Sequence, residues 1–398
     1  MNICESTPMS VCKGYSRIFN EISTAIVLLA FLAGCGGGGG GGSGGAGSGP
    51  PDTTVPTVTA MTPGEDNSGV ATNGKITATL SEAMVPALIT AIDPATNNPA
   101  NFRLANGANF IPGTVSYDTT NHIAVFTPTG SLAPNTRYTA TVITGIKDLG
   151  NNPLTTDFAW CFETGGTADS TPPGVTSTVP VNGTTGVAVN RKITATFSEE
   201  MNSSTLTPAS FTVTGPGATP VSGTVTYPGG TAVFTPSAGL AANTTYTATI
   251  GTGAMDLASN ALQANVIWSF TTGASADVTA PVVLSNDPAG APSGVAISNT
   301  IKVTFSEAMD PATITTANFA VTGPGTTPVV GTVAFDATNN TATFTRINHP
   351  NTLVTSHPTP VSYLEPNTTY TATLTAGAKD MAGNALANNR VWSFTTAP

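Results

Sequence analysis

One sequence pattern occurs three times along the chain, and this repeat limits the fold more than any other feature. Residues 76–84 recur at 193–201 and again at 301–309. Each copy ends with a Trp that is followed two residues later by a Phe, and the three Trp residues are 108 and 124 positions apart. Solenoid repeats are only about 20 to 50 residues long, so this period predicts three whole domains in tandem.

Within each copy, apolar residues alternate with polar ones. In the second copy Ile193, Ala195 and Phe197 alternate with Thr, and residues 246–250 follow the same period. Successive side chains of a β-strand point to opposite faces, so this period predicts strands with one face in a core and a Thr-rich face in water. About seven such short strands per copy, separated by Gly, Pro and Asn turns, predict an antiparallel β-sandwich. We expect the closing Trp residues to pack in its core rather than to form a carbohydrate platform.

The N-terminus is typical of an exported protein. Lys13 and Arg17 precede an uncharged apolar run at 25–33, which is too short to span a bilayer but suits the core of a signal peptide. The run ends in Leu-Ala-Gly-Cys, with the Cys at position 35, and this resembles the lipobox of bacterial lipoproteins. The resemblance implies that the signal is cut before Cys35 and that Cys35 is lipidated. The alternative is an ordinary secretory signal with an incidental Cys.

A flexible tether is predicted after Cys35. Residues 36–51 are nearly all Gly and end in two Pro, a composition that cannot build a core. Position 36 is Gly rather than the Asp that would retain a lipoprotein at the inner membrane. The lipoprotein resemblance therefore implies a lipid anchor in the outer membrane or at the cell surface, with the membrane as a partner.

The remaining cysteine is expected to be structurally unimportant. Once the signal is removed, only Cys35 and Cys161 remain, and the lipid occupies Cys35. We therefore expect no disulfide framework. Ser269 and Ser393 occupy the position of Cys161 in the other copies, which predicts a substitution on a solvent-facing side of the strand.

Several motifs of the three copies together resemble bacterial Ig-like domains of the SbsA type, which occur in S-layer and other exported surface proteins. They are an Asp shortly before a Pro, Phe-Ser-Glu-x-Met, Asn-Thr-x-Tyr-Thr-Ala, a Lys-Asp turn with Gly and Asn, and a closing Trp-Ser-Phe-Thr-Thr. Residues 132–138 also resemble a tyrosine corner, in which a Tyr hydroxyl bonds backbone just upstream. The resemblance covers about residues 52–398 and implies an all-β chain of three tandem immunoglobulin-like antiparallel β-sandwiches.

These features divide the chain into five segments. The predicted segments are a lipoprotein signal peptide at 1–34, the lipidated Cys and Gly-rich tether at 35–51, Ig-like domain 1 at 52–166, Ig-like domain 2 at 167–274, and Ig-like domain 3 with an extra loop at 275–398.

Composition argues against several functions. The 398 residues carry a net charge of −10 and only 9% are charged, whereas a nucleic-acid binder needs clustered Lys and Arg. The three His residues lack zinc-ligand spacing. A Gly-x-Ser-x-Gly match at 41–45 lies in polyglycine, where no strand-to-helix elbow can form. We therefore expect no enzyme, no catalytic residues and no organic cofactor.

Repeated acidic residues are the candidate metal ligands. Each copy opens with an Asp, has a Glu at the end of its Ile-containing strand, and has a second Asp in the turn before its last strand; these residues are Asp52, Asp169 and Asp277, then Glu82, Glu199 and Glu307, then Asp148, Asp256 and Asp380. Such turn residues commonly bond backbone groups. The alternative is Ca²⁺, because oxygen atoms of a linker Asp, a turn Asp and an amide can meet at a domain junction. The candidate ligands for that ion are Asp148, Asp169, Asp256, Asp277 and Asp380.

The third copy carries an insertion. Phe344 and Tyr370 are 26 positions apart, whereas the corresponding Phe234 and Tyr246 are 12 apart. The added residues, about 347–360, include two of the three His residues, His349 and His357, and lie between Arg346 and Tyr363. Such a loop is either a contact site for a ligand or a tolerated surface insertion.

Together these features predict an exported structural stalk or adhesion module that contacts an unidentified surface or extracellular ligand. Two alternatives stay open. A carbohydrate- or ice-binding protein would use flat Thr-rich faces, and a periplasmic accessory subunit of an enzyme complex would use the same domains on the inner side of the outer membrane.

Overall fold

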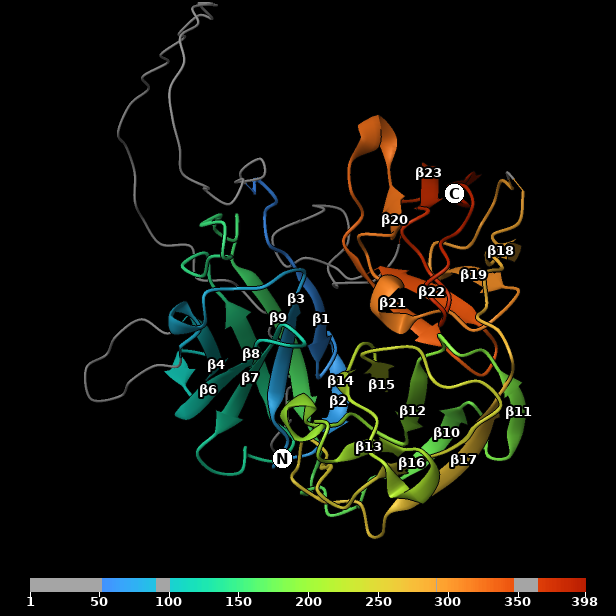
Figure 1. Cartoon of the computed structure of the whole chain (residues 1–398). Coiled ribbons are helices and arrows are strands. Elements are labelled where there is room, and N and C mark those ends of the chain that lie inside the picture. Colours follow the sequence, from blue (N-terminus) through green and yellow to red (C-terminus); the bar gives the residue numbers. More distant parts are fainter. Residues whose placement is uncertain (1–51, 91–100, 291, 347–363) are drawn as a thin grey trace, which may run out of the picture.

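The computed structural model describes residues 52–90, 101–290, 292–346 and 364–398 (Figure 1). The signal peptide, Cys35, the tether and the loop at 347–360 lie outside these residues, so the statements about them stay predictions. In the described ranges, no helix combines the length and the apolar character that crossing a membrane requires.

Each copy folds as a β-sandwich of two sheets, as the alternating pattern predicted. In domain 1 the first sheet has the order β1 (Val58–Thr62), β3 (Ile76–Leu80), β7 (Ile123–Pro128), β6 (Gly113–Asp118). The second sheet has the order β2 (Asn67–Val70), β9 (Phe158–Thr164), β8 (Arg137–Val142), β4 (Phe102–Asn106), β5 (Asn109–Phe110). All pairs are antiparallel except β2 with β9.

Domains 2 and 3 repeat this arrangement. In domain 2 the first sheet has the order β10 (Val175–Val179), β12 (Ile193–Phe197), β15 (Thr231–Pro236), β14 (Gly223–Thr226). In domain 3 the first sheet has the order β18 (Val283–Asp287), β19 (Ile301–Phe305), β22 (Thr341–Arg346), β21 (Gly331–Asp336). The second sheet of domain 2 has the order β11 (Thr184–Val187), β17 (Val266–Thr272), β16 (Thr245–Ile250), β13 (Phe211–Thr214). The second sheet of domain 3 has the order β20 (Phe319–Thr322), β23 (Thr369–Leu374), β24 (Arg390–Thr395). The remaining regular elements are short 3₁₀ turns: η1 (Pro86–Leu88), η2 (Ser203–Thr205), η3 (Pro216–Ala218), η4 (Pro311–Thr313) and η5 (Pro324–Thr326).

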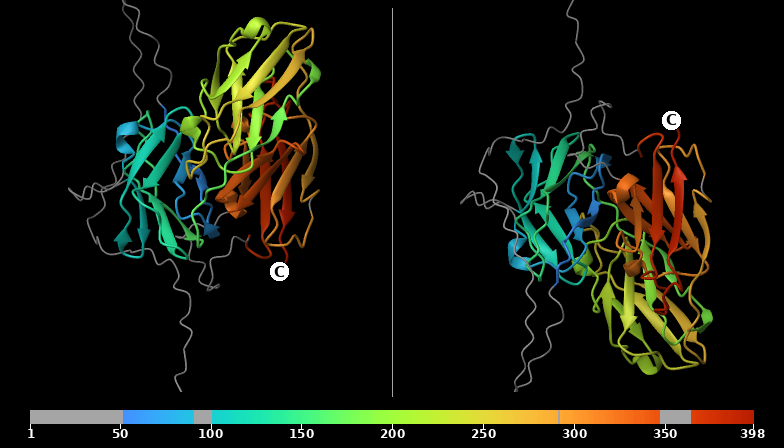
Figure 2. Two further views of the ribbon diagram at one scale, coloured as in Figure 1. Left: turned by 90° about the horizontal axis from the view of Figure 1, so that it is seen from below. Right: turned by 90° about the horizontal axis from the view of Figure 1, so that it is seen from above.

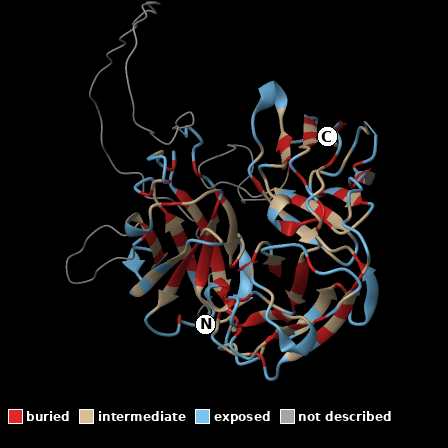
Figure 3. Ribbon diagram, viewed as in Figure 1, coloured by how far each residue is buried: buried red, intermediate tan, exposed pale blue. Residues whose placement is uncertain are grey.

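Each sandwich has its own aromatic core (Figure 3). In domain 2 the Phe211 ring lies 5.7 Å from Phe234 and 5.8 Å from Trp268, measured between ring centroids. Trp268 is 3% exposed, and its counterparts Trp160 and Trp392 are also buried. The closing Trp residues therefore pack in the core, as predicted, and tilted aromatic pairs of this kind add to the energy of apolar burial.

The predicted tyrosine corner occurs in all three domains. The hydroxyl of Tyr138 accepts a hydrogen bond from the Ala133 backbone N–H at 2.8 Å, and the Tyr246 hydroxyl accepts one from Ala241 at the same distance. In domain 3 the Tyr370 hydroxyl accepts a bond from the Glu365 N–H. This bond fixes the chain where it enters the strand that follows.

Two predictions about solvent-facing residues were wrong. Cys161 is only 4% exposed, so it is not a substitution on a solvent-facing side of its strand. On the first sheets Thr77, Thr194 and Thr231 are only 9%, 3% and 3% exposed, although the alternation placed such Thr residues in water. In domain 1 the outer face of the first sheet, which carries Thr77, lies against Met201 and Leu257 of domain 2, an interaction that a local period does not contain.

The three domains form a cluster rather than a straight row (Figure 2). Both views in Figure 2 show domain 3, in orange and red, beside domain 1 as well as domain 2. Strands β1 and β21, from domains 1 and 3, are in contact. Domain 1 is therefore next to both other domains.

Candidate functional site

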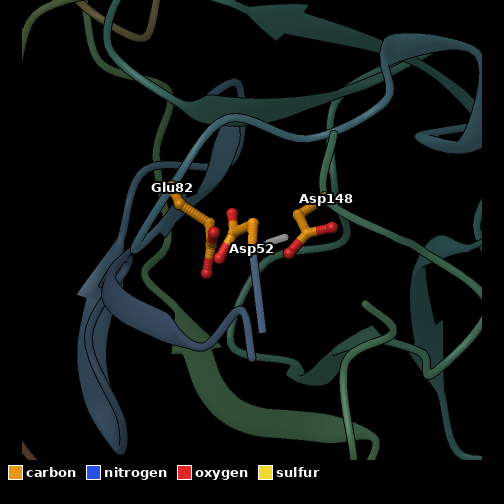
Figure 4. Close-up of side chains that lie close together, drawn as sticks. All are labelled: Asp52, Glu82 and Asp148. Atoms are coloured by element: carbon orange, nitrogen blue, oxygen red, sulfur yellow. The ribbon is translucent and has the colours of Figure 1, made fainter. Parts of the chain in front are cut away.

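Each domain brings three carboxylates together around its opening Asp. The opening Asp, the Glu that follows β3, β12 or β19, and the turn Asp before the last strand have carboxylate oxygens within 4.8 Å of one another. We call these sets triad 1 (Asp52, Glu82, Asp148), triad 2 (Asp169, Glu199, Asp256) and triad 3 (Asp277, Glu307, Asp380). In Figure 4 the three side chains of triad 1 converge from separate segments of domain 1.

The turn Asp is held in place by an Asn four residues later. In triad 2, Asp256 Oδ1 accepts a bond from the Asn260 N–H at 2.8 Å, and Oδ2 accepts one from the Asn260 side-chain amide at 2.8 Å. Triads 1 and 3 contain the same two bonds between turn Asp and Asn. Each turn Asp is 1% exposed. A local Asp–Asn turn therefore fixes a buried carboxylate in advance.

The opening Asp is fixed by its own turn and by two amides. Asp169 Oδ1 accepts a bond from the Thr171 N–H at 2.8 Å, and its carbonyl accepts one from Asn260 of the same domain. Asn73 of domain 1 bonds both the N–H and the carbonyl of Asp169, at 2.7 and 2.9 Å. The opening Asp of domain 2 thus belongs to triad 2 and is also the residue by which domain 1 holds domain 2.

Packing the carboxylates together changes how the Glu residues titrate. Desolvation, and then the charges of Asp169 and Asp256, raise the pKa of Glu199 from 4.5 to about 7. The pKa of Glu82 and that of Glu307 are raised for the same kinds of reason. Like charges in a partly dehydrated site disfavour ionisation, so the three carboxylates of each triad repel one another.

The triads have the donor set that a hard divalent cation prefers. Ca²⁺ binds carboxylate oxygens, and three of them from three chain segments would be drawn together around one ion. Glu82 Oε1 is buried and has no hydrogen-bond partner among the described residues. Buried polar atoms normally have a partner, and a bound cation would supply one here. The residues present therefore fit a Ca²⁺ ion, which would neutralise the mutual repulsion.

The five Asp residues singled out in the sequence all lie in triads. They are Asp148 in triad 1, Asp169 and Asp256 in triad 2, and Asp277 and Asp380 in triad 3. The amide that was expected among the ligands donates its NH2 to the turn Asp. The third carboxylate is the Glu, and Asp52 completes triad 1; both had been noticed as repeated acids but not assigned as ligands. Their recurrence at the same place in all three copies is the sequence signal by which they could have been assigned as ligands.

The comparison with family models assigns the fold of all three domains. The family model described as bacterial Ig-like domain matches residues 52–164, 169–272 and 277–396. No curated protein matches the chain in a sequence search. Solved structures with a partial likeness include surface layer protein SbsC, domains 1–6, at 12% identity over 87% of this chain and 54% of that chain, with a TM-score of 0.23. Another is the chicken CNTN1 FN1–FN3 fragment, at 12% identity over 84% and 100%, with a TM-score of 0.18. The chain thus spans about half of the SbsC structure, and TM-scores this low carry no argument about function.

Proposed function

Because the chain belongs to the bacterial Ig-like domain family, we propose that it is an exported, non-catalytic surface protein whose three Ig-like domains form one structural and binding module. A lipid on Cys35 anchors this module in the outer membrane or at the cell surface. The segment at 36–51 separates the anchor from the folded domains. The triads bind Ca²⁺, and where a triad lies at a junction the ion helps to fix two consecutive domains relative to one another.

The position of the opening Asp is the observation that carries this proposal. Asp169 supplies a carboxylate to triad 2, while Asn73 of the preceding domain bonds its backbone at both ends. Asp277 has the same double role, in triad 3 and with Asn190 of domain 2. An ion that orders this Asp therefore also orders the connection between two domains.

The arrangement of the domains favours a compact module over an extended stalk. Domain 1 touches domain 3 through β1 and β21, so the chain turns back on itself within three domains (Figure 2). A straight stalk would keep its first and third domains apart. The module is therefore a head carried on the tether, and any reach from the membrane comes from residues 36–51.

The Thr-rich faces support the carbohydrate- or ice-binding alternative only weakly. Such binding needs a flat, accessible Thr array, yet Thr77, Thr194 and Thr231 are covered. The Thr residues on the second sheets, such as Thr247 and Thr249 of β16, are half-buried on a twisted strand rather than fully exposed.

Thermal unfolding with and without calcium tests the metal part of the proposal. The melting temperature of the full mature chain should be higher in excess CaCl₂ than in EDTA by about 5 °C or more, because ligand at about 100 times its Kd adds about 2.7 kcal/mol. The E82Q/E199Q/E307Q variant is the matched control and should respond far less. Equal melting temperatures in CaCl₂ and EDTA would remove calcium from the account.

Labelling of a C-terminal tag tests the location. A membrane-impermeant probe should label the tag on intact cells, and Cys35→Ser should release the protein from the membrane fraction. Labelling only after the outer membrane is permeabilised would favour the periplasmic accessory subunit instead. A Cys35→Ser protein that stays in the membrane fraction would contradict the lipid anchor.

A further inference from the structure

The three triads contain the same carboxylates but have different positive neighbours. The residues before β3 read Asn73-Gly74-Lys75, and those before β12 read Asn190-Arg191-Lys192. Each of these segments faces the triad of the following domain. Position 191 is thus an Arg where the equivalent position of domain 1 is a Gly.

Arg191 lies between two residues that are both bonded to the chain around triad 3. On one side, Asn190 bonds the N–H and the carbonyl of Asp277 at 2.9 and 3.0 Å. On the other side, the Lys192 N–H donates to the carbonyl of Met381, which directly follows Asp380. Arg191 and Asp277 also line one cleft of about 620 Å³ beside the junction. The backbone therefore places Arg191 beside triad 3.

The charge of Arg191 acts on all three carboxylates of that triad. Burial lowers the pKa of Arg191, while the charges of Glu307, Asp277 and Asp380 raise it. The ion pairs of the described residues are Arg137 with Asp66 and Lys192 with Asp310, so Arg191 acts on the triad from beyond direct pairing distance. A partly buried site is poorly screened by water, so a positive charge at this range still offsets the negative triad.

The junction of domains 1 and 2 has the same backbone frame without this charge. Asn73 bonds Asp169, and the Lys75 N–H donates to the carbonyl of Leu257, which follows Asp256. Gly74 stands between them and has no side chain. Lys75 interacts with Asp256 alone of the triad 2 carboxylates. A Cβ added to Gly74 would meet only the Ala71 carbonyl oxygen, at 3.5 Å, so this position has room for a side chain.

We propose that Arg191 is a built-in counter-cation for triad 3, which makes the junction of domains 2 and 3 independent of calcium, whereas the junction of domains 1 and 2 requires a bound ion. This inference rests on the proposed function, because it assigns that calcium to triads 1 and 2. Calcium affinity in oxygen sites depends on the net charge of the ligands, and Arg191 lowers the net negative charge at triad 3. Triad 3 should therefore bind Ca²⁺ at least about tenfold more weakly than triad 2.

Two reciprocal variants with matched controls test this assignment. Arg191→Met removes the charge and keeps most of the aliphatic stem, and Arg191→Lys keeps the charge. Gly74→Arg places the charge at the other junction, and Gly74→Met controls for side-chain bulk there. Isothermal titration of the full mature chain with CaCl₂ measures the number of sites and their dissociation constants, and added E199Q or E307Q identifies which triad each site belongs to.

The wild type should show weaker binding at triad 3, and R191M should tighten that site by about tenfold or more, while R191K leaves it weak. G74R should weaken triad 2 by a similar factor, and G74M should not. Three equal sites in the wild type, unaffected by R191M, would overturn the role of Arg191 while leaving the proposed function intact.

A second measurement keeps the inference testable if no calcium binds at all, an outcome that defeats the proposed function instead. In EDTA, R191M should lower the melting temperature, because triad 3 loses the charge that offsets its repulsion, and R191K should keep the wild-type value. An R191M melting temperature in EDTA equal to or above that of the wild type would contradict the counter-cation role without any reference to calcium.

Discussion

The two domain junctions share one backbone frame and differ in how their charges are balanced. In both, an Asn bonds the opening Asp of the next domain and a Lys backbone N–H bonds the turn after the next triad. At the second junction the Lys192 ammonium also pairs with Asp310, and Arg191 faces triad 3. At the first junction Lys75 forms no ion pair among the described residues and acts on Asp256 alone, and Gly74 carries no charge.

This difference shows that a repeated fold can keep its interface geometry while each copy changes its electrostatics. The second junction carries its positive charges on the chain itself, so we expect it to keep its geometry without a bound cation. The first junction contains Glu199, whose pKa is raised to about 7, and has Gly74 at the position of Arg191. We therefore expect this junction to depend on a cation taken up from the solution. We expect any motion between domains to be confined to domains 1 and 2.

The largest effect should come from breaking the ion pair of the second junction. Lys192→Met leaves Asp310, whose side chain is 4% exposed, without its cation, and should lower the free energy of unfolding by about 2 kcal/mol. Lys75→Met at the first junction removes no ion pair and should cost less than about 0.5 kcal/mol. Denaturant unfolding followed by Trp fluorescence measures both. Equal losses would mean that the two junctions are held in the same way.

The next effect concerns the frame that the junctions share. Asn73→Ala and Asn190→Ala each delete two side-chain bonds to the following Asp and should each cost about 1 to 2 kcal/mol. Ser298 occupies this position in domain 3, and its side chain bonds no other domain among the described residues, so Ser298→Ala should be neutral. A cost at Ser298 as large as at the two Asn residues would refute the idea that this position serves domain docking.

The smallest effect is a pH dependence that separates triad 2 from triad 3. The pKa of Glu199 is about 7 in the folded chain and 4.5 otherwise, so the folded state binds more protons between these values. Stability in EDTA should therefore fall as the pH rises from about 4.5 to 7, and then level off. Glu199→Gln should remove much of this slope. Glu307→Gln should change it less, because Arg191 opposes the rise in the pKa of Glu307. A larger change for Glu307→Gln would contradict the comparison.

The sequence predicted the fold well because its signals are local. Strand alternation at Ile193, Ala195 and Phe197 follows from the pleat of a single strand, and the tyrosine corner at Tyr246 spans only five residues. The docking of one domain on the next was missed because it joins segments about 100 residues apart. Thr194 is 3% exposed and the equivalent Lys302 is exposed, although both stand at the second position of their strand.

The candidate site could be predicted only in part, because it also depends on contacts between segments that are far apart in the sequence. The repeated Asp residues indicated that oxygen atoms gather at each junction, but the third carboxylate depends on how β12 ends relative to the turn at Asp256. Only the folded sandwich brings Glu199 to that turn. Asn260 was expected to offer its amide oxygen to an ion, but it donates from its backbone N–H and its side-chain NH2 to Asp256, so it acts as a hydrogen-bond donor to the triad.

The most direct test of the account is the position of bound calcium in crystals of the mature chain grown with CaCl₂, located by anomalous scattering. The account predicts an ion at triad 2, with oxygen atoms of Asp169, Glu199 and Asp256 about 2.3 to 2.6 Å away, and a lower occupancy or none at triad 3. An ordered junction between domains 1 and 2 with no ion among these three carboxylates would contradict it.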